Sequence, residues 1–213
     1  YSVEGGDNIR GLIHEAMSQQ SGDPSKFYKS DLIRNEGFGS TNLADEFVTL
    51  QNMHSVQPHR VVQPLDLSFD NTGKIIGYNM ENFPGVSLRD YTAYGLNIPK
   101  YTMQNIDRSI KKLHSKGIVH GDLHAGNILI DPTTGRDFRI IDPVGFPNIY
   151  DNPNFNNFLN NNGIWGVNEG DFTNMNLNDR QRYLIDQEYR NLNSSLRIPN
   201  NFKNPYAFPE NQL

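Results

Sequence analysis

The segment Ile118–Ile130 reads IVHGDLHAGNILI and places a polar loop between two short apolar runs. In this loop Asn127 follows Asp122 by five residues, and a second acid, Asp142, ends a strand-like run twenty residues after the first. Phosphoryl transfer uses such a set, because one carboxylate accepts the proton of the attacking hydroxyl while an amide oxygen and a second carboxylate hold Mg²⁺ against the phosphates. Mg²⁺ prefers such oxygen ligands. The alternative is a loop whose Asp and Asn only cap turns, and the combined spacing argues against it.

This pattern resembles the catalytic residues of the protein-kinase superfamily. His120, Gly121 and Asp122 with Asn127 are similar to the catalytic loop, and Asp142 stands where the Asp-Phe-Gly metal motif begins. The resemblance implies that Asp122 is the catalytic base and that Asn127 and Asp142 bind Mg²⁺. It also implies that His120 supports the loop and that ATP is the phosphate donor. The fold class that follows is α+β, a bilobal kinase-like fold with a strand-rich N-lobe and a truncated helical C-lobe.

Two charged residues upstream match further parts of such an enzyme. A strand-like run at 26–29 ends in Lys29, and a helix is expected near 42–53, where apolar residues recur at helical spacing. The resemblance implies that Lys29 binds the α- and β-phosphates and that Glu46 on this helix pairs with it. A lone strand lysine is usually a solvated charge, so this interpretation depends on the catalytic loop.

Further strands are expected in the N-terminal part of the chain. Val61–Val62 and Lys74–Met80 are apolar, strand-like runs, and Asp70–Gly73 is typical of a hairpin loop between strands. Earlier in the chain, Gly6–Ile13 resembles the glycine-rich loop of kinases, with Asn8 in place of its middle glycine. Asn tolerates the required backbone conformations better than most residues. This resemblance implies that Gly6, Asn8 and Gly11 contact ATP.

The segment after the last of these strands resembles the hinge between kinase lobes. It implies that Met80 is the gatekeeper at the back of the pocket and that the backbone of Glu81 to Phe83 binds adenine. Helices are expected after it, one capped by Thr102 and ending near Ser115, and one over 178–191. We therefore expect a single minimal kinase domain, 1–213, with an N-lobe, a hinge and a C-lobe at residues 1–81, 82–85 and 86–213.

Three departures from the kinase pattern narrow the prediction. Gly121 replaces the usual Arg before the catalytic Asp, so no guanidinium is available there to pair with a phosphorylated activation loop. His124 stands where protein Ser/Thr kinases usually carry a Lys that contacts the γ-phosphate. Pro143 and Val144 replace Phe-Gly, which argues against a mobile metal motif.

The stretch after Asp142 is too short for the full helical lobe of an ordinary protein kinase. In this truncation the chain resembles the minimal kinase effectors that bacteria inject into host cells through type III secretion. It is nearest to the small family that phosphorylates the host chaperone heat-shock protein 90, and the enterobacterial effectors that blunt inflammatory signalling are another candidate. The resemblance implies a Ser/Thr protein kinase and virulence factor, secreted into the host cytoplasm and monomeric, that acts on a host protein. The chain starts at Tyr1 without an initiator Met, so we expect a processed or shortened form.

Two other functions stay open. The run His-Gly-Asp-Leu-His is also typical of aminoglycoside- and choline-kinase-like enzymes, although these usually insert a large helical segment between hinge and catalytic loop. The interval from Glu81 to His120 is too short to hold one. A non-catalytic pseudokinase binding module would lack at least one of the Lys, Asp, Asn and Asp positions, and all four are filled.

Composition excludes several other classes of protein. The chain has 213 residues, enough for one domain, with 19 Lys+Arg against 24 Asp+Glu and a net charge of −5. We therefore expect neither nucleic acid nor an anionic membrane as a partner. Cysteine is absent, which excludes disulfides, thiol catalysis and thiolate metal sites. No apolar run is long enough to span a bilayer.

Overall fold

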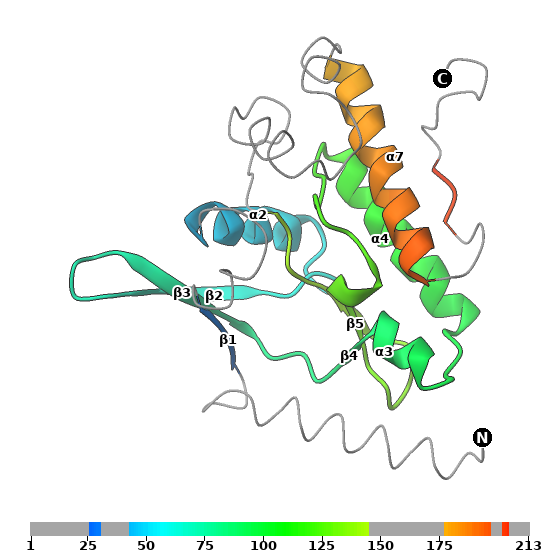
Figure 1. Ribbon diagram of the computed structural model, residues 1–213, viewed down its shortest axis with the longest axis horizontal. Coiled ribbons are helices and arrows are strands. Elements are labelled where there is room, and N and C mark those ends of the chain that lie inside the picture. The colour runs from blue at the N-terminus through cyan, green and yellow to red at the C-terminus, as the bar shows by residue number, and fades with distance from the viewer. Residues whose placement is uncertain (1–25, 31–42, 145–176, 197–201, 205–213) are drawn as a thin grey trace.

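The computed structural model describes residues 26–30, 43–144, 177–196 and 202–204 (Figure 1). The predicted glycine-rich loop with Gly6, Asn8 and Gly11 lies outside these residues. The predicted α+β class is confirmed by the elements of the described residues. In chain order they are β1 (Lys26–Ser30), α2 (Leu43–Val56), β2 (Pro64–Phe69), β3 (Ile75–Glu81), β4 (Val86–Ser87), α3 (Leu88–Ala93), α4 (Lys100–Ser115), the 3₁₀ helix η2 (Ala125–Asn127), β5 (Ile128–Ile130), β6 (Phe138–Ile140) and α7 (Leu177–Leu196).

The first sheet has the strand order β1-β3-β2, and both strand pairs are antiparallel. A tight turn joins β2 to β3, as the sequence predicts. In it Asp70 accepts hydrogen bonds from the hydroxyl of Thr72 and from the amides of Lys74 and Thr72, and these bonds lower the pKa of Asp70. Gly73 follows with φ of +83°, a left-handed conformation that glycine adopts without strain.

The strand expected at Val61–Val62 is wrong, because the strand that pairs with β3 begins at Pro64. Val61 instead forms an isolated parallel bridge with Ile140, and the amide of Val62 donates to the carbonyl of Ile140 at 3.2 Å. Both valines are buried. Their burial in the core, rather than pairing in the first sheet, explains this apolar run.

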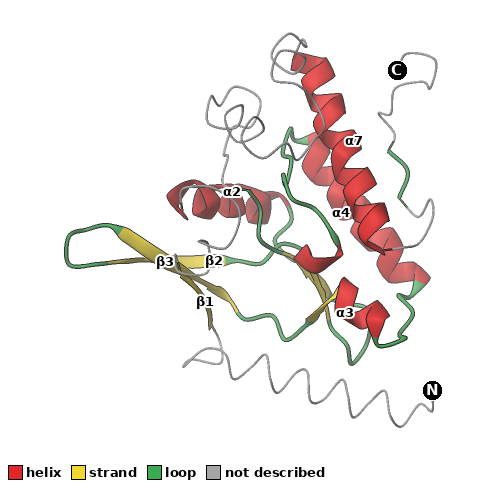
Figure 2. Ribbon diagram, in the orientation of Figure 1, coloured by secondary structure: helices red, strands yellow, loops and turns green. Residues whose placement is uncertain are grey.

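Helix α2 packs on one face of the first sheet (Figure 2). Its apolar face is buried in the way its spacing predicts, and the residues are Leu43, Phe47, Leu50 and Met53. The ring of Phe47 meets the ring of Tyr78 on β3 edge to face, with centroids 5.7 Å apart. Burial of each such side chain stabilises the fold by about 1.5–3 kcal/mol, so this interface fixes the position of α2 over the sheet.

The predicted helix before the catalytic loop is present as α4, which buries Ile106, Ile110 and Leu113. It ends before Gly117, which has φ of +73°. The predicted cap is wrong: the helix begins at Lys100, and the buried hydroxyl of Thr102 donates to the carbonyl of Gly135 instead. Thr hydroxyls bind backbone carbonyls as readily as they cap helices, so the residue type alone could not decide between the two.

The last described helix, α7, lies alongside α4 (Figure 1). Its buried face carries Leu184, Ile185 and Tyr189, as the sequence predicts. The helix extends to Leu196 rather than to Asn191, because Leu192 and Leu196 continue the same face and are also buried. Helix α7 thereby covers α4 and the loop that follows it.

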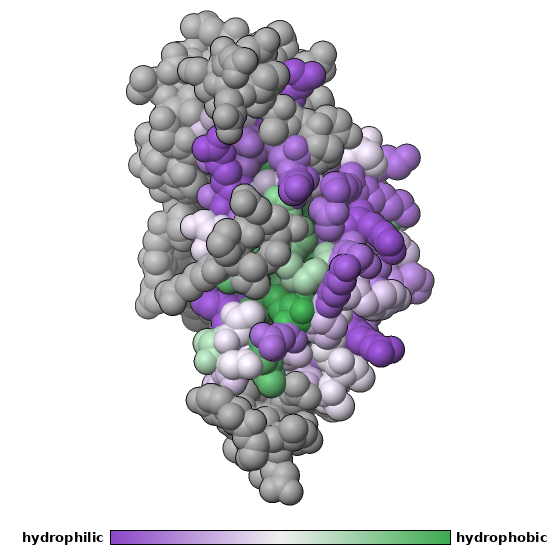
Figure 3. All heavy atoms as spheres, turned by 90° about the vertical axis from the view of Figure 1, so that its right-hand side faces the viewer, coloured by the Kyte–Doolittle hydropathy of each residue, from purple (hydrophilic) through white to green (hydrophobic). Residues whose placement is uncertain are grey.

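Residues 82–85 connect the first sheet to a second, smaller sheet with the order β4-β5-β6. Two backbone bonds also join the segment after α2 to β6, since Ile140 donates to Arg60 and accepts from Val62. On the face that Figure 3 turns toward the viewer, the described residues are mostly hydrophilic, with a small hydrophobic area in the middle. Within the described ranges, every helix is too short or too polar to cross a membrane.

Candidate active site

Two carboxylates from distant parts of the chain contact Lys29. The ammonium group of Lys29 on β1 contacts the carboxylate of Glu46 on α2 and lies 3.0 Å from Oδ1 of Asp142, which follows β6. Glu46 is only 2% exposed, and the hydroxyl of Tyr78 also donates to it at 2.7 Å. A buried carboxylate needs such partners, and here a cation and a hydroxyl supply them.

Asp142 reaches Lys29 because the backbone turns sharply after β6. Its φ of +54° makes Asp142 the one non-glycine among the described residues with a positive φ. Asp adopts this left-handed conformation more readily than most residues. The amide of the preceding residue, Ile141, donates to the carbonyl of Asn127 at 3.0 Å. This bond fixes the segment that carries Asp142 against the catalytic loop.

Asn127 and Asp122 are joined across the catalytic loop. The side-chain amide of Asn127 donates to the backbone carbonyl of Asp122 at 2.8 Å and to its carboxylate at 3.3 Å. The donor end of the amide therefore faces Asp122. Its carbonyl oxygen, the atom that ligates metals, is not used in these bonds.

His120 connects this loop to the segment before Asp142. One ring nitrogen, Nδ1, accepts the amide hydrogen of Asp122 at 3.1 Å, and the other lies 2.6 Å from the carbonyl of Ile141, to which it donates. Both bonds are satisfied by the neutral ring with its proton on Nε2. Burial lowers the pKa of His120 below its usual value, which favours that neutral form. The predicted supporting role of His120 thus has a structural basis.

Gly121 occupies a position that excludes a side chain. Its φ is +92°, and a Cβ added there would lie 2.8 Å from Cβ of Val144. Val144 is held in place because its amide donates to the carbonyl of His120 at 2.9 Å. Val144 therefore fits beside position 121 because that position is Gly and not the usual Arg. Together they bring the segment after Asp142 against the loop.

A buried carboxylate on α7 binds the backbone of the same loop. Oε1 of Glu188 accepts the amide hydrogen of Gly121 at 2.8 Å, and Oε2 lies 2.8 Å from Nε2 of His114 on α4. Both side chains are 1% exposed. Glu188 is not among the residues predicted from the sequence, although a charged residue in line with Leu184 and Leu192 on the apolar face of a helix is a signal of a buried role.

His124 lies on the outer side of the loop. Its Nδ1 accepts from the amide of Gly126 at 2.9 Å and from the guanidinium of Arg89 on α3 at 3.2 Å, while Nε2 lies 3.6 Å from the carboxylate of Asp122. The neighbouring amide of Ala125 donates to the hydroxyl of Ser195 on α7. Arg89 and Ser195 were not found from the sequence, and they lie on elements distant from the loop in the chain.

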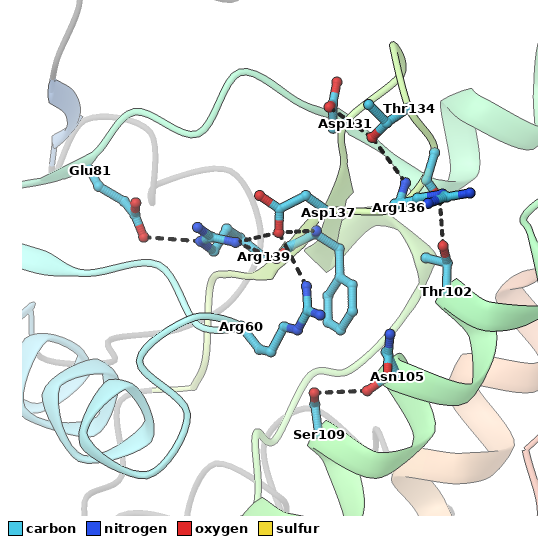
Figure 4. A network of polar contacts seen from close by, with 12 residues as sticks. Arg60, Glu81, Thr102, Asn105, Ser109, Asp131, Thr134, Arg136, Asp137 and Arg139 are labelled. Carbon is cyan, nitrogen blue, oxygen red and sulfur yellow. Dashed lines mark hydrogen bonds and ion pairs between the residues drawn. The ribbon is translucent and has the colours of Figure 1, made fainter.

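Ion pairs hold the start of the hinge segment, and Figure 4 shows Arg139 between the carboxylates of Glu81 and Asp137. The carboxylate of Glu81 accepts from the amide of Gln63 and from Nε of Arg139, and the guanidinium of Arg139 stacks over the ring of Phe83. The amide of Glu81 donates to Gln63, and the carbonyl of Phe83 accepts from Gly85. These bonds engage two backbone groups of the segment, and the adenine contacts of Glu81 to Phe83 stay a prediction. Met80 is buried in the core.

The described donor set fits one divalent cation with oxygen ligands. The amide oxygen of Asn127 and the carboxylate of Asp142 are the hard donors that Mg²⁺ prefers, and Asp142 is partly exposed, at 39% of its side chain. No group of three or more His, Cys, Asp or Glu residues in the described part of the chain is placed to hold a metal. The fit therefore rests on these two residues, and their metal-binding role stays a prediction.

The structure thus gathers most of the predicted site. Lys29, Glu46 and Asp142 lie in contact, and Asp122 and Asn127 form a second group joined to them through Ile141 and His120. Such an arrangement can bind phosphates at a lysine, hold a cation at an amide and a carboxylate, and offer a carboxylate to a hydroxyl proton.

Comparison with known proteins gives matches to kinases. The sequence matches the lipopolysaccharide kinase (Kdo/WaaP) family over residues 20–142, more than half of the chain and the part that holds the site described above. It is 28% identical over 142 residues to cyclin-dependent kinase B2-1 of Arabidopsis thaliana, which covers 62% of this chain and 44% of that protein. The chain therefore spans less than half the length of this relative. Both matches confirm the resemblance to the protein-kinase superfamily, and the chain belongs to the lipopolysaccharide kinase (Kdo/WaaP) family.

Proposed function

We propose that this chain is an ATP-dependent protein kinase that transfers the γ-phosphate to a Ser or Thr hydroxyl of a protein. The observation that carries the proposal is the meeting of Lys29 with both Glu46 and Asp142. Three segments separated along the sequence converge on one cation, which has 16% of its side chain exposed. A structural ion pair needs one partner, whereas a phosphate-binding lysine held between two carboxylates is positioned for a ligand.

In the proposed reaction the oxygen of the acceptor hydroxyl forms a bond to the γ-phosphorus of ATP. The bond between that phosphorus and the bridging oxygen breaks, ADP leaves with the bonding electrons, and the hydroxyl proton passes to the carboxylate of Asp122. Asn127 positions this carboxylate through its bond to Oδ2. Lys29 binds the phosphates of ATP.

Mg²⁺, when bound, neutralises charge on the phosphate oxygens. Asn127 and Asp142 would hold it. The bond of Lys29 to Oδ1 of Asp142 orients this carboxylate, and the backbone bond of Ile141 to Asn127 keeps the two ligand residues on adjacent segments.

A protein acceptor is favoured by the short segment between hinge and catalytic loop. It contains only β4, the six residues of α3 and the sixteen of α4 as described elements. Small-molecule kinases usually use a large helical insertion here to enclose their acceptor. The similarity to a cyclin-dependent kinase also supports this choice. We further propose that the enzyme is a monomeric bacterial effector, delivered into the host cytoplasm, whose acceptor is a host protein such as heat-shock protein 90.

The second candidate is a phosphotransferase acting on a small molecule or a sugar. It is supported by the name of the matching family, the lipopolysaccharide kinases, and by Gly121 and His124 in the catalytic loop. A pseudokinase function is less well supported, because the structure brings together the lysine, both aspartates and the asparagine that catalysis requires.

Mg²⁺-dependent ATP turnover tests the site. We expect turnover in the wild type and its loss in Lys29→Ala and Asp142→Ala. Lys26→Ala is the matched control, since Lys26 lies on the same strand and its side chain pairs, within the described part of the chain, only with Asp66, at 3.7 Å on the surface. Equal turnover in all four proteins contradicts the assigned roles.

The acceptor class requires a second experiment. Labelled ATP is supplied with a host lysate, with aminoglycosides and amino alcohols, or with lipopolysaccharide, and the labelled product is identified. Label in host proteins supports the proposal, and label only in a small molecule or in lipopolysaccharide supports the second candidate. Phosphoproteomics of host cells that express the wild type or Asp142→Ala would then identify the acceptor.

A further inference from the structure

A pocket beside the catalytic loop is lined by α3 and the end of α7. Its volume is about 540 Å³, and its walls are formed by Arg89, Thr92, Ala93, Ser194, Ser195 and Leu196. Of these six residues only Arg89 carries a charge. Two of the residues that line the pocket contact the catalytic loop. Arg89 contacts His124, and Ser195 accepts from the amide of Ala125.

The charge of Arg89 has no carboxylate partner among the described residues. The contact of its guanidinium is with the ring nitrogen of His124, which carries no negative charge. Arg60, Arg139 and Arg190, in contrast, each pair with an aspartate. Asp90 is next to Arg89 on α3, but adjacent helical residues do not face each other. Among the described residues, Arg89 therefore offers the pocket a cation that no carboxylate pairs with.

The hydroxyls of the pocket are mostly committed to the protein. Thr92 donates its hydroxyl hydrogen to the carbonyl of Leu88, and Ser195 donates to Leu192 while it accepts from Ala125. Arg89 is thus the main donor left for a ligand. A guanidinium presents several N–H groups in one plane, which match the oxygens of a carboxylate or a phosphate. The ligand suited to this pocket is an anionic oxygen group.

The contacts of His124 place Arg89 close to the reacting centre. Both groups bound to Nδ1, the amide of Gly126 and the guanidinium of Arg89, can only donate, so Nδ1 carries no proton. The proton of the neutral ring is then on Nε2, which faces the carboxylate of Asp122 at 3.6 Å. Glycine at 126 permits this packing, because a Cβ there would lie 2.7 Å from the His124 ring and 3.4 Å from the guanidinium carbon. Arg89 is therefore two contacts from Asp122, through His124.

We propose that Arg89 is a specificity-determining residue that binds an acidic group of the acceptor, a carboxylate or phosphate next to the hydroxyl that is phosphorylated. This inference rests on the proposed function and names its substrate class as acidic segments of protein. The ligand belongs to the acceptor because His124 connects the pocket to Asp122, the residue that receives the hydroxyl proton in the proposed reaction.

The test uses peptides with a single Ser or Thr in which each flanking position is held in turn at Glu, Gln or Lys. We expect the wild type to prefer Glu over Gln by about tenfold in kcat/KM at one or more positions, through a higher KM for the neutral peptide. Arg89→Gln should lose this preference, and Arg89→Glu should shift it toward Lys. Arg108→Gln is the matched control, because it removes an exposed arginine of α4 whose one polar side-chain contact among the described residues is with Asn105.

Binding of the preferred peptide, measured by fluorescence anisotropy, gives a readout that does not depend on turnover. It should weaken in Arg89→Gln and stay at the wild-type value in Arg108→Gln. The inference is overturned if the wild type phosphorylates peptides without regard to charge, or if the preference survives in Arg89→Gln. If no peptide is phosphorylated, the protein-kinase function fails separately. Glycerate and glycerol then serve as anionic and neutral acceptors, and equal transfer to both, or transfer to neither, overturns the role of Arg89.

Discussion

Removing the buried carboxylate of Glu188 should destabilise both the fold and the catalytic loop. In Glu188→Ala the amide of Gly121 and Nε2 of His114 each lose a partner at 2.8 Å. An unpaired buried donor costs about 1–3 kcal/mol, and breaking a buried pair costs about 3–5 kcal/mol in total. For a chain of this size each kcal/mol lowers Tm by about 2–4 °C. We therefore expect Tm to fall by roughly 6–20 °C.

Glu188→Gln should be much milder, because its amide keeps the shape of the side chain. Its oxygen can accept from Gly121, and its NH₂ group can donate to Nε2 of His114 once the ring proton moves to Nδ1. Nδ1 of His114 has no partner among the described residues, so this change of tautomer breaks no bond. We expect a cost of about 1 kcal/mol, the value of one ordinary hydrogen bond.

The assay is thermal unfolding, which gives Tm, and urea unfolding, together with ATP turnover, for both variants and for Asp186→Ala. Asp186 lies on the same helix with 22% of its side chain exposed, pairs with Arg190 at 2.7 Å and accepts from the side-chain amide of Asn204 at 3.4 Å. An i,i+4 pair such as that with Arg190 is worth about 0.3–0.5 kcal/mol. Turnover should fall with Glu188→Ala even where the protein is fully folded, since Gly121 precedes Asp122. If Glu188→Ala unfolds at the same urea concentration as Asp186→Ala, Glu188 does not hold the loop.

Three other predictions follow from the same site. Gly121→Ala should lose about 1–2 kcal/mol of stability in urea unfolding, because its φ of +92° and its contact with Val144 both oppose a side chain. Val144→Ala in the same chain should restore only the small part due to Cγ2 of Val144 at 3.0 Å, because alanine keeps the Cβ at 2.8 Å. Burial lowers the pKa of His120 in the folded protein, so below about pH 6.5 the unfolded chain binds more protons than the folded one. The free energy of unfolding should therefore fall as pH drops through this range, by at most about 1.4 kcal/mol per pH unit. In His120→Asn this part of the pH dependence of unfolding should disappear, and an unchanged slope would contradict the assignment. Tyr78→Phe removes one of the bonds to the buried Glu46 and should destabilise the protein by about 1 kcal/mol, and a denaturation midpoint equal to that of the wild type would show that this bond contributes nothing.

The sequence predicted those parts of the site in which chemistry and spacing are local. Asp122 and Asn127 share one loop, so a fixed interval of five residues was enough to place them together. Lys29 and Glu46 were found through the resemblance to kinases, and the structure places them in contact. Apolar periodicity predicted α4 correctly, because burial of one helix face is a property of that helix alone.

The sequence did not predict residues whose role depends on packing between distant elements. Glu188 and Arg89 are ordinary charged residues in the chain, and only the packing of α7 and α3 against the loop brings them to Gly121 and His124. The same reason explains the wrong cap at Thr102. Its hydroxyl had two possible acceptors, and the one used, the carbonyl of Gly135, lies on a turn thirty-three residues away.

Two of the substitutions that distinguish this chain from ordinary protein kinases, Gly121 and Val144, have one structural consequence. Val144 packs directly on the catalytic loop at Gly121, and Glu188 accepts from the amide of Gly121, the residue before Asp122. A side chain at position 121 would separate these segments. The loop is therefore held by the core of the protein, through buried residues of α7, and it needs no arginine paired with a phosphate. We expect for this reason that the activity of the chain does not depend on its own phosphorylation, and phosphatase treatment of the purified protein should leave ATP turnover unchanged.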